Sequence, residues 1–157
     1  MYTKEDLLKW CDAEYCLKSV KQNGIALRYV INQTDEICLD AINQNNYALQ
    51  YIKTQTEEIC LIAVKQYGEA LRYVNNQTEE ICLEAVKQYG KALQYVNNQT
   101  DEICLEAVKQ NGHALRYVKN RTEEICLEAL NQNSKSIQYI NIQKYPELYE
   151  KYVFMIK

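Results

Sequence analysis

The sequence predicts an all-α protein, a short α-solenoid of six helix–turn–helix repeats. A threonine recurs every 22 residues and opens nearly the same phrase each time, Thr-Glu/Asp-Glu-Ile-Cys-Leu. These threonines are Thr34, Thr56, Thr78, Thr100 and Thr122, and Asp12 opens a sixth, looser copy. A unit this short cannot bury its own apolar face. Neighbouring units must therefore stack to form one continuous core.

The repeat boundaries follow from these residues, and we number the positions of each repeat from 1 to 22. The repeats span residues 12–33, 34–55, 56–77, 78–99, 100–121 and 122–143. Residues 1–11 are expected to form an N-terminal capping helix and residues 144–157 a C-terminal one, within a single domain of residues 1–157. Pro146 suits the first turn of the last helix. Its apolar stripe of Leu148, Tyr152 and Met155 is heavy for a lid, which makes homodimerisation through this helix an alternative.

The first half of each repeat predicts a helix of about ten residues. Thr or Asp at position 1 is a good N-cap, and the acidic residues that follow favour the positive end of the helix dipole. Apolar residues at positions 4, 5, 6, 8 and 9 cover more than half of the helix circumference, which is typical of a helix packed between neighbours. Position 13 holds all four glycines, and we expect them to close the helix in the left-handed conformation.

The second half predicts another helix, from about position 14 to position 20. Ala or Ser, Leu or Ile, Tyr, and Val or Ile occupy positions 15, 16, 18 and 19, a spacing that places them on one face. Position 11 is always Gln and position 18 always Tyr. We interpret both as structural, with the amide bonded to nearby backbone and the ring packed between repeats.

Six of the seven cysteines occupy position 5, inside the apolar run. Equivalent points on stacked helices lie roughly 9–10 Å apart, whereas a disulfide needs Cα atoms within about 7 Å. We therefore expect reduced, buried thiols in a reducing compartment, and Cys11 as an exception on the N-terminal cap. A ladder of metal ions is the alternative, but no His or second Cys recurs beside these cysteines.

Composition narrows the classes of function. The formal net charge is −3, which argues against a generic binder of nucleic acid. No apolar run is long enough for a membrane span, and the first residues do not read as a secretory signal. The sole histidine, His113, sits at a variable position and is expected to be exposed. Because no set of unlike catalytic groups recurs, we predict no enzyme activity, no catalytic residues, no cofactor and no metal.

Variation between the six copies points to a binding surface. Position 17 alternates between Arg and Gln, position 14 differs in nearly every repeat, and both lie on the open face of the second helix. This face is our candidate for partner binding, and a solvated face that has drifted is the alternative. The candidate residues are Ile25, Arg28, Tyr47, Gln50, Glu69, Arg72, Lys91, Gln94, His113, Arg116, Lys135 and Gln138.

The repeat phrase resembles a known family. The segment Glu106-Ala107-Val108-Lys109-Gln110-Asn111-Gly112-His113-Ala114-Leu115 is similar to a helical repeat of unknown function from amoeba-infecting giant viruses of the mimivirus type and from some amoeba-associated bacteria. The likeness covers residues 12–143. It implies a virus-encoded protein that acts in host cytoplasm through macromolecular contacts, and it carries over no activity or binding residues.

We therefore expect a non-enzymatic scaffold for protein–protein interaction, with a host or viral protein as partner. A reader of single-stranded RNA is an alternative, since helical repeats can read one base each with two or three side chains. The acidic balance opposes it. A self-assembling structural element is a further alternative.

Overall fold

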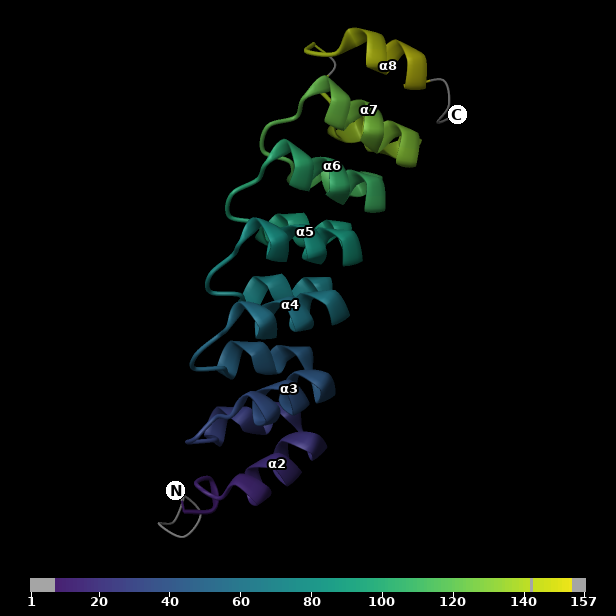
Figure 1. Ribbon diagram of the computed structural model, residues 1–157. Coiled ribbons are helices and arrows are strands. Elements are labelled where there is room, and N and C mark those ends of the chain that lie inside the picture. The colour runs from purple at the N-terminus through teal and green to yellow at the C-terminus, as the bar shows by residue number, and fades with distance from the viewer. Residues whose placement is uncertain (1–7, 142, 154–157) are drawn as a thin grey trace. The chain divides into compact units, whose positions relative to one another are not determined.

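The structure, a computed structural model, describes residues 8–141 and 143–153. Over these residues the chain is helical without strands, and each repeat supplies one α-helix of ten residues and one 3-10 helix of six (Figure 1). The α-helices are α2 (Ala13–Gln22), α3 (Asp35–Gln44), α4 (Glu57–Gln66), α5 (Glu79–Gln88), α6 (Asp101–Gln110) and α7 (Glu123–Gln132). The 3-10 helices are η1 (Gly24–Tyr29), η2 (Asn46–Tyr51), η3 (Gly68–Tyr73), η4 (Gly90–Tyr95), η5 (Gly112–Tyr117) and η6 (Ser134–Tyr139). The predicted all-α repeat fold is confirmed.

The ends of the chain are described only in part. Helix α8 (Pro146–Val153) follows the last repeat and begins at the predicted proline. Most of the expected N-terminal capping helix, residues 1–7, and residues 154–157 with Met155 lie outside the described residues. None of the described helices combines the length and the apolar character needed to cross a bilayer.

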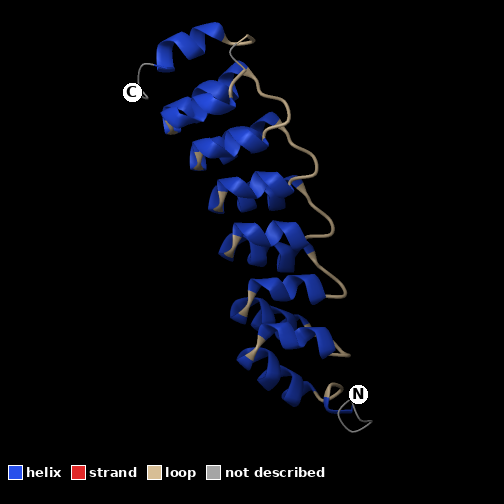
Figure 2. Cartoon of the chain, turned by 180° about the vertical axis from the view of Figure 1, so that it is seen from behind, coloured by secondary structure: helices blue, strands red, loops and turns tan. Residues whose placement is uncertain are grey.

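Two compact units make up the chain, Met1–Asn76 and Gln77–Lys157. Within each unit the α-helices of consecutive repeats pack side by side in one layer, which we name the α layer, and the 3-10 helices form a second, the η layer. The longer loops that lead from each 3-10 helix to the next α-helix lie along one edge of each unit, opposite the tight turns within each repeat (Figure 2).

The α-helices begin where the sequence predicts. In repeats 2 to 6 the Thr hydroxyl oxygen at position 1 accepts a hydrogen bond from the backbone N–H at position 4, at 3.3 to 3.4 Å. Asp12 accepts the equivalent bond from Tyr15 at 2.7 Å. Each cap of this kind stabilises a helix by about 1 kcal/mol.

The helix ends differ from the prediction, because none of the described glycines has a positive φ. Position 12 instead adopts an extended conformation, as in Asn111 with φ −154°, and the glycine that follows starts the 3-10 helix. The glycine is needed for close packing. A Cβ on Gly112 would lie 2.5 Å from the carbonyl oxygen of Ala129 in the next repeat, and a Cβ on Gly90 would lie 2.5 Å from that of Ala107.

The second helix is also shorter than predicted and of the 3-10 type, since it ends at position 18. The side chain at position 22, which is Gln in every repeat except the fifth, where it is Arg121, bonds carbonyl groups near this end. Gln99 Nε2 donates to the carbonyl oxygens of Leu93, at 3.3 Å, and of Tyr117 in the next repeat, at 3.0 Å, while its Oε1 accepts from the Lys119 N–H at 3.0 Å. The side chain thus satisfies the last carbonyl groups of the helix and joins two repeats, a role that the sequence analysis missed.

The core lies between the two layers. In repeats 2 to 6 the residues at positions 4, 5, 8, 9, 15, 16 and 19 are all buried. All seven cysteines are free, the six at position 5 are buried, and Cys11 is exposed, so the predicted burial of the thiols is confirmed. Burial raises the pKa of the Cys38 and Cys104 thiols to about 11, with a further contribution from Asp35 and Asp101.

Candidate functional site

The structure brings the predicted partner-binding residues together in the η layer of each unit. All six residues at position 17 are exposed, and position 14 is exposed in three repeats and half-buried in the other three. The first unit carries Ile25, Arg28, Tyr47, Gln50, Glu69 and Arg72, and the second carries Lys91, Gln94, His113, Arg116, Lys135 and Gln138.

The alternation at position 17 corresponds to two side-chain geometries. Arg28 places its guanidinium carbon 4.7 Å from the ring centroid of Tyr29. In repeats 3 and 5 the guanidinium carbon lies 5.0 Å from the ring centroid of the tyrosine that follows the arginine. Gln94 instead folds back, and its Nε2 donates to the carbonyl oxygen of Lys91 at 3.1 Å; the glutamines of repeats 2 and 6 make the same bond. Odd repeats therefore present a cation on an aromatic ring, and even repeats present an amide.

The two aromatic residues at position 14, Tyr47 and His113, reach the tyrosine of the next repeat. The rings of Tyr47 and Tyr73 lie 5.6 Å apart, and those of His113 and Tyr139 lie 6.0 Å apart, edge to face. This contact corrects the prediction for His113, which is half-buried rather than exposed. Its Nε2 lies 3.2 Å from the amide nitrogen of Asn133, and its Nδ1 is buried without a hydrogen-bond partner.

The tyrosines at position 18 form packed elements of the η layer. Every one of them is half-buried. Neighbouring groups cover several of the rings. The ring centroids of Trp10 and Tyr29 lie 5.3 Å apart, and arginine guanidinium groups cover three of the tyrosine rings. The half-burial agrees with the packed ring expected at this position, and the rings of Tyr29, Tyr73 and Tyr117, which arginines cover, are not open platforms on which bases could stack.

Three of the glutamines at position 11 bond backbone, as expected, but the backbone belongs to the preceding repeat, so these side chains join repeats. Gln44 accepts from the Gly24 N–H at 2.6 Å, and Gln110 and Gln132 accept from the corresponding glycines at 2.8 and 2.6 Å. All six glutamines at this position are nevertheless exposed. The second repeat departs from this arrangement, because Asn46 replaces glycine and Gln66 donates to Asn43 Oδ1 at 2.8 Å.

Comparison with known proteins agrees with this repeat architecture. Five overlapping segments match the family described as Domain of unknown function (DUF4116), over residues 12–56, 34–78, 56–101, 78–122 and 100–145. The chain belongs to the DUF4116 family. No curated protein and no solved structure matches it. Each match spans two repeats and successive matches are offset by one, so a DUF4116 unit corresponds to two neighbouring pairs of α-helix and 3-10 helix.

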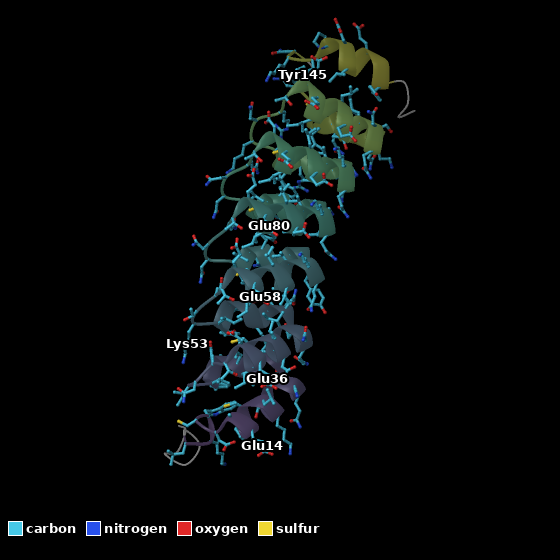
Figure 3. The ribbon with its side chains drawn as sticks, in the orientation of Figure 1. Glu14, Glu36, Lys53, Glu58, Glu80 and Tyr145 are labelled. Atoms are coloured by element: carbon cyan, nitrogen blue, oxygen red, sulfur yellow. The ribbon has the colours of Figure 1, made fainter. Side chains whose placement is uncertain are left out.

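Charge is distributed unevenly over the second unit of this DUF4116 protein. Helices η4, η5 and η6 carry Lys91, Arg116 and Lys135 and contain no Asp or Glu. Helices α5, α6 and α7 each carry three carboxylates, among them Glu80, which projects from α5 in Figure 3. The α layer of this unit is therefore acidic and its η layer basic.

The first compact unit, Met1–Asn76, has a hollow at its loop edge. It measures about 400 Å³, and its lining includes Ile31, Asp35 and Lys53. The ammonium group of Lys53, labelled in Figure 3, is already engaged, since it donates to the carbonyl oxygens of Val30 at 3.2 Å and of Ile31 at 2.8 Å. Its role there is to hold two successive loops together.

Proposed function

We propose that this DUF4116 protein is a non-enzymatic scaffold that binds protein partners through its η layer. One observation carries the proposal. The buried positions are nearly identical from repeat to repeat, whereas positions 14 and 17 differ and lie on the accessible side of the 3-10 helices. The fold needs the first set, and a surface that distinguishes partners needs variety in the second.

A protein partner is favoured over single-stranded RNA by the state of the aromatic rings. Bases bound without sequence preference stack on open aromatic side chains within a basic groove. Here the tyrosines at position 18 are half-buried, with Arg116 over Tyr117 and His113 against Tyr139. The net charge of −3 also weakens long-range attraction of a polyphosphate.

The family resemblance and the thiols suggest where the protein acts. Six buried, reduced cysteines suit a reducing compartment. For a protein encoded by a virus of amoebae, the host cytoplasm is such a compartment, and we propose that the partner is a host or viral protein met there.

The C-terminal helix supports a lid more than a homodimer. Leu148 and Tyr152 on α8 are each only 7% exposed, and the Tyr152 hydroxyl donates to Asn131 Oδ1 of the last repeat at 2.8 Å. Much of the apolar stripe that suggested dimerisation is thus used within the chain. We propose a monomer as the active form, to be checked by light scattering over a range of concentrations.

The test compares two charge-matched variants in affinity capture. The η-layer variant carries Glu at Arg28, Arg72 and Arg116, and the control carries Glu at Lys21, Lys65 and Lys109, which are exposed at position 10 of the same three repeats. Captured proteins are identified, purified and titrated against all three forms. The proposal requires a purified partner that binds the wild-type chain and the control but not the η-layer variant. If every partner binds the two variants equally well, the η layer is not the binding surface.

A further inference from the structure

The η layer of the second unit combines local positive charge with an ordered spacing. It carries one cation in each of three consecutive repeats, Lys91, Arg116 and Lys135, of which the last two are exposed and Lys91 is half-buried. The carboxylates of the same unit lie in α5, α6 and α7 of the α layer and in α8, which carries Glu147 and Glu150. An anionic partner is therefore attracted to the η side of this unit in spite of the negative net charge.

The spacing of the cations fits one conformation of a peptide. Stacked helices lie roughly 8–10 Å apart, so successive repeats offer a cation at about that interval along the stack, with Arg116 one 3-10 turn further along its own helix than Lys91 and Lys135 are along theirs. A polyproline II segment rises about 3.1 Å per residue with three residues per turn, which places every third side chain on the same side, about 9 Å further along. A β-strand alternates its side chains with a period of two and does not match.

We infer that this surface docks an acidic peptide segment in an extended, polyproline II-like conformation, with a carboxylate at every third residue. The inference rests on the proposed function and deepens it, since it names the chemistry of the partner and the half of the η layer that holds it. In the first unit Glu69 stands among the candidate residues, so the same acidic segment is less favoured there.

The side chains around the three cations suit such a segment. The stacking of Arg116 on Tyr117, at 5.0 Å, restrains the guanidinium plane, and a restrained fork of N–H donors binds a carboxylate with little further loss of entropy. Gln94 and Gln138 occupy the same repeat position on either side of Arg116. Each amide already donates one N–H to the carbonyl group at position 14, which leaves its second N–H and its Oε1 for the backbone of the segment, a backbone that polyproline II leaves without internal hydrogen bonds.

Single-stranded RNA fits this surface less well. Three cations neutralise few phosphates, and affinity that depends on few phosphate contacts is low at physiological salt. Two of the rings on which bases could stack already have neighbours, since Arg116 covers Tyr117 and His113 packs edge to face with Tyr139.

The experiment measures fluorescence anisotropy of labelled probes with three forms of the full chain. The first probe is a peptide in which Glu occupies every third position and Pro and Ala fill the positions between. The second probe has the same composition with its Glu residues contiguous, and the third is oligouridylate. The η variant is Lys91→Gln, Arg116→Gln and Lys135→Gln. Its control, with the same change in net charge, is Lys65→Gln, Lys87→Gln and Lys109→Gln, three exposed residues of the α layer.

The fold is expected to tolerate the η variant, because Gln occupies position 17 in alternate repeats of the native chain and position 14 already accommodates Ile, Tyr, Glu, Lys and His. If the triple variant does not fold, Arg116→Gln alone replaces it, with Lys109→Gln as its control. The expected loss is then about threefold rather than about tenfold or more, since each exposed charge pair contributes modestly.

The inference requires that the spaced peptide bind the wild-type chain, bind the η variant at least about tenfold more weakly, and bind the control within about twofold. Four results would overturn it: no binding of the spaced peptide, equal affinity for the contiguous peptide, equal losses in both variants, or tighter binding of oligouridylate. A purified partner that depends on the η layer but is not displaced by the spaced peptide overturns this inference alone. A partner that depends only on the α layer overturns the proposed function instead, whatever the peptide does.

Discussion

Replacing Gly112 by alanine tests whether close packing between repeats, rather than backbone conformation, explains the glycine at position 13. Gly112 has no positive φ, so alanine can adopt the same backbone conformation without strain. Where the surroundings leave room, such a replacement stabilises a protein by about 0.4–1 kcal/mol, because it restricts the unfolded chain. The environment of Gly112 leaves no room. An added Cβ would lie 2.5 Å from Ala129 O, 2.8 Å from Gln132 Oε1 and 2.9 Å from Ser136 Oγ.

The magnitude follows from these contacts. Overpacking of a tight interface typically costs about 1–3 kcal/mol. The hydrogen bond from the Gly112 N–H to Gln132 Oε1, at 2.6 Å, must lengthen as α7 moves away, and its loss would cost about 1 kcal/mol more. After the gain from the unfolded chain is subtracted, we expect a net destabilisation of about 1–3 kcal/mol. For a chain of this size this lowers the Tm by about 2–10 °C.

The assay is reversible thermal and urea unfolding followed by circular dichroism, with two further variants. Ser134→Ala, at the same position of the last repeat, retains a Cβ that the fold already accommodates and is expected to change stability by less than about 0.5 kcal/mol. Gly112→Asn separates the two explanations. Asn tolerates the left-handed conformation well, but its larger side chain meets the same close contacts, so we expect it to destabilise at least as much as alanine. An unchanged or raised Tm for Gly112→Ala would refute the reasoning.

Three further results are expected. Gln99→Ala removes three hydrogen bonds, two of them to the next repeat, and should destabilise the chain by about 1–3 kcal/mol, with faster hydrogen exchange at the Lys119 amide; unchanged exchange would contradict the bonding described. Brief alkylation of the native protein, read by mass spectrometry, should label Cys11 alone of the seven thiols, and uniform labelling would show that the core is open. The pKa of Cys38 and Cys104 is raised to about 11, so these thiols stay protonated when folded while the unfolded chain loses the protons near its ordinary value of 9.0. Their contribution to stability is therefore complete below about pH 9 and falls as the pH rises towards 11, which urea unfolding at both pH values measures.

The sequence predicts well those features of the fold that depend on residues within a single repeat. Thr100 caps α6 through a bond to a residue three places along, and the apolar pattern after it has one face to bury. Such features are visible in any single copy. The period of 22 residues then predicts that copies stack, because a hairpin of this size has no core of its own.

What the sequence analysis missed depends on the neighbouring repeat. Gly112 looks like a helix terminator until the carbonyl group of Ala129 is placed against it. Gln99 looks like a loop residue, although its side chain reaches carbonyl groups six residues back and eighteen residues ahead. His113 looks exposed from its variable position, yet the ring of Tyr139 meets it. Only a stacking geometry, which a one-dimensional pattern does not supply, brings these atoms together.

The 3-10 form of the second helix has a consequence for recognition. A 3-10 helix has three residues per turn, so residues at positions 14 and 17 eclipse one another, whereas in an α-helix they would be offset. Each repeat therefore presents one aligned pair of side chains, such as Lys91 with Gln94 or His113 with Arg116. The residues that hold the fold lie at other positions, 15, 16 and 19, so a pair can change without disturbing the core. Exchange of the pairs between η4 and η5 should accordingly leave the free energy of unfolding within about 0.5 kcal/mol of the native value while altering affinity for a partner. A large loss of stability on exchange would mean that the pairs serve the fold, and that the variation between repeats does not encode binding.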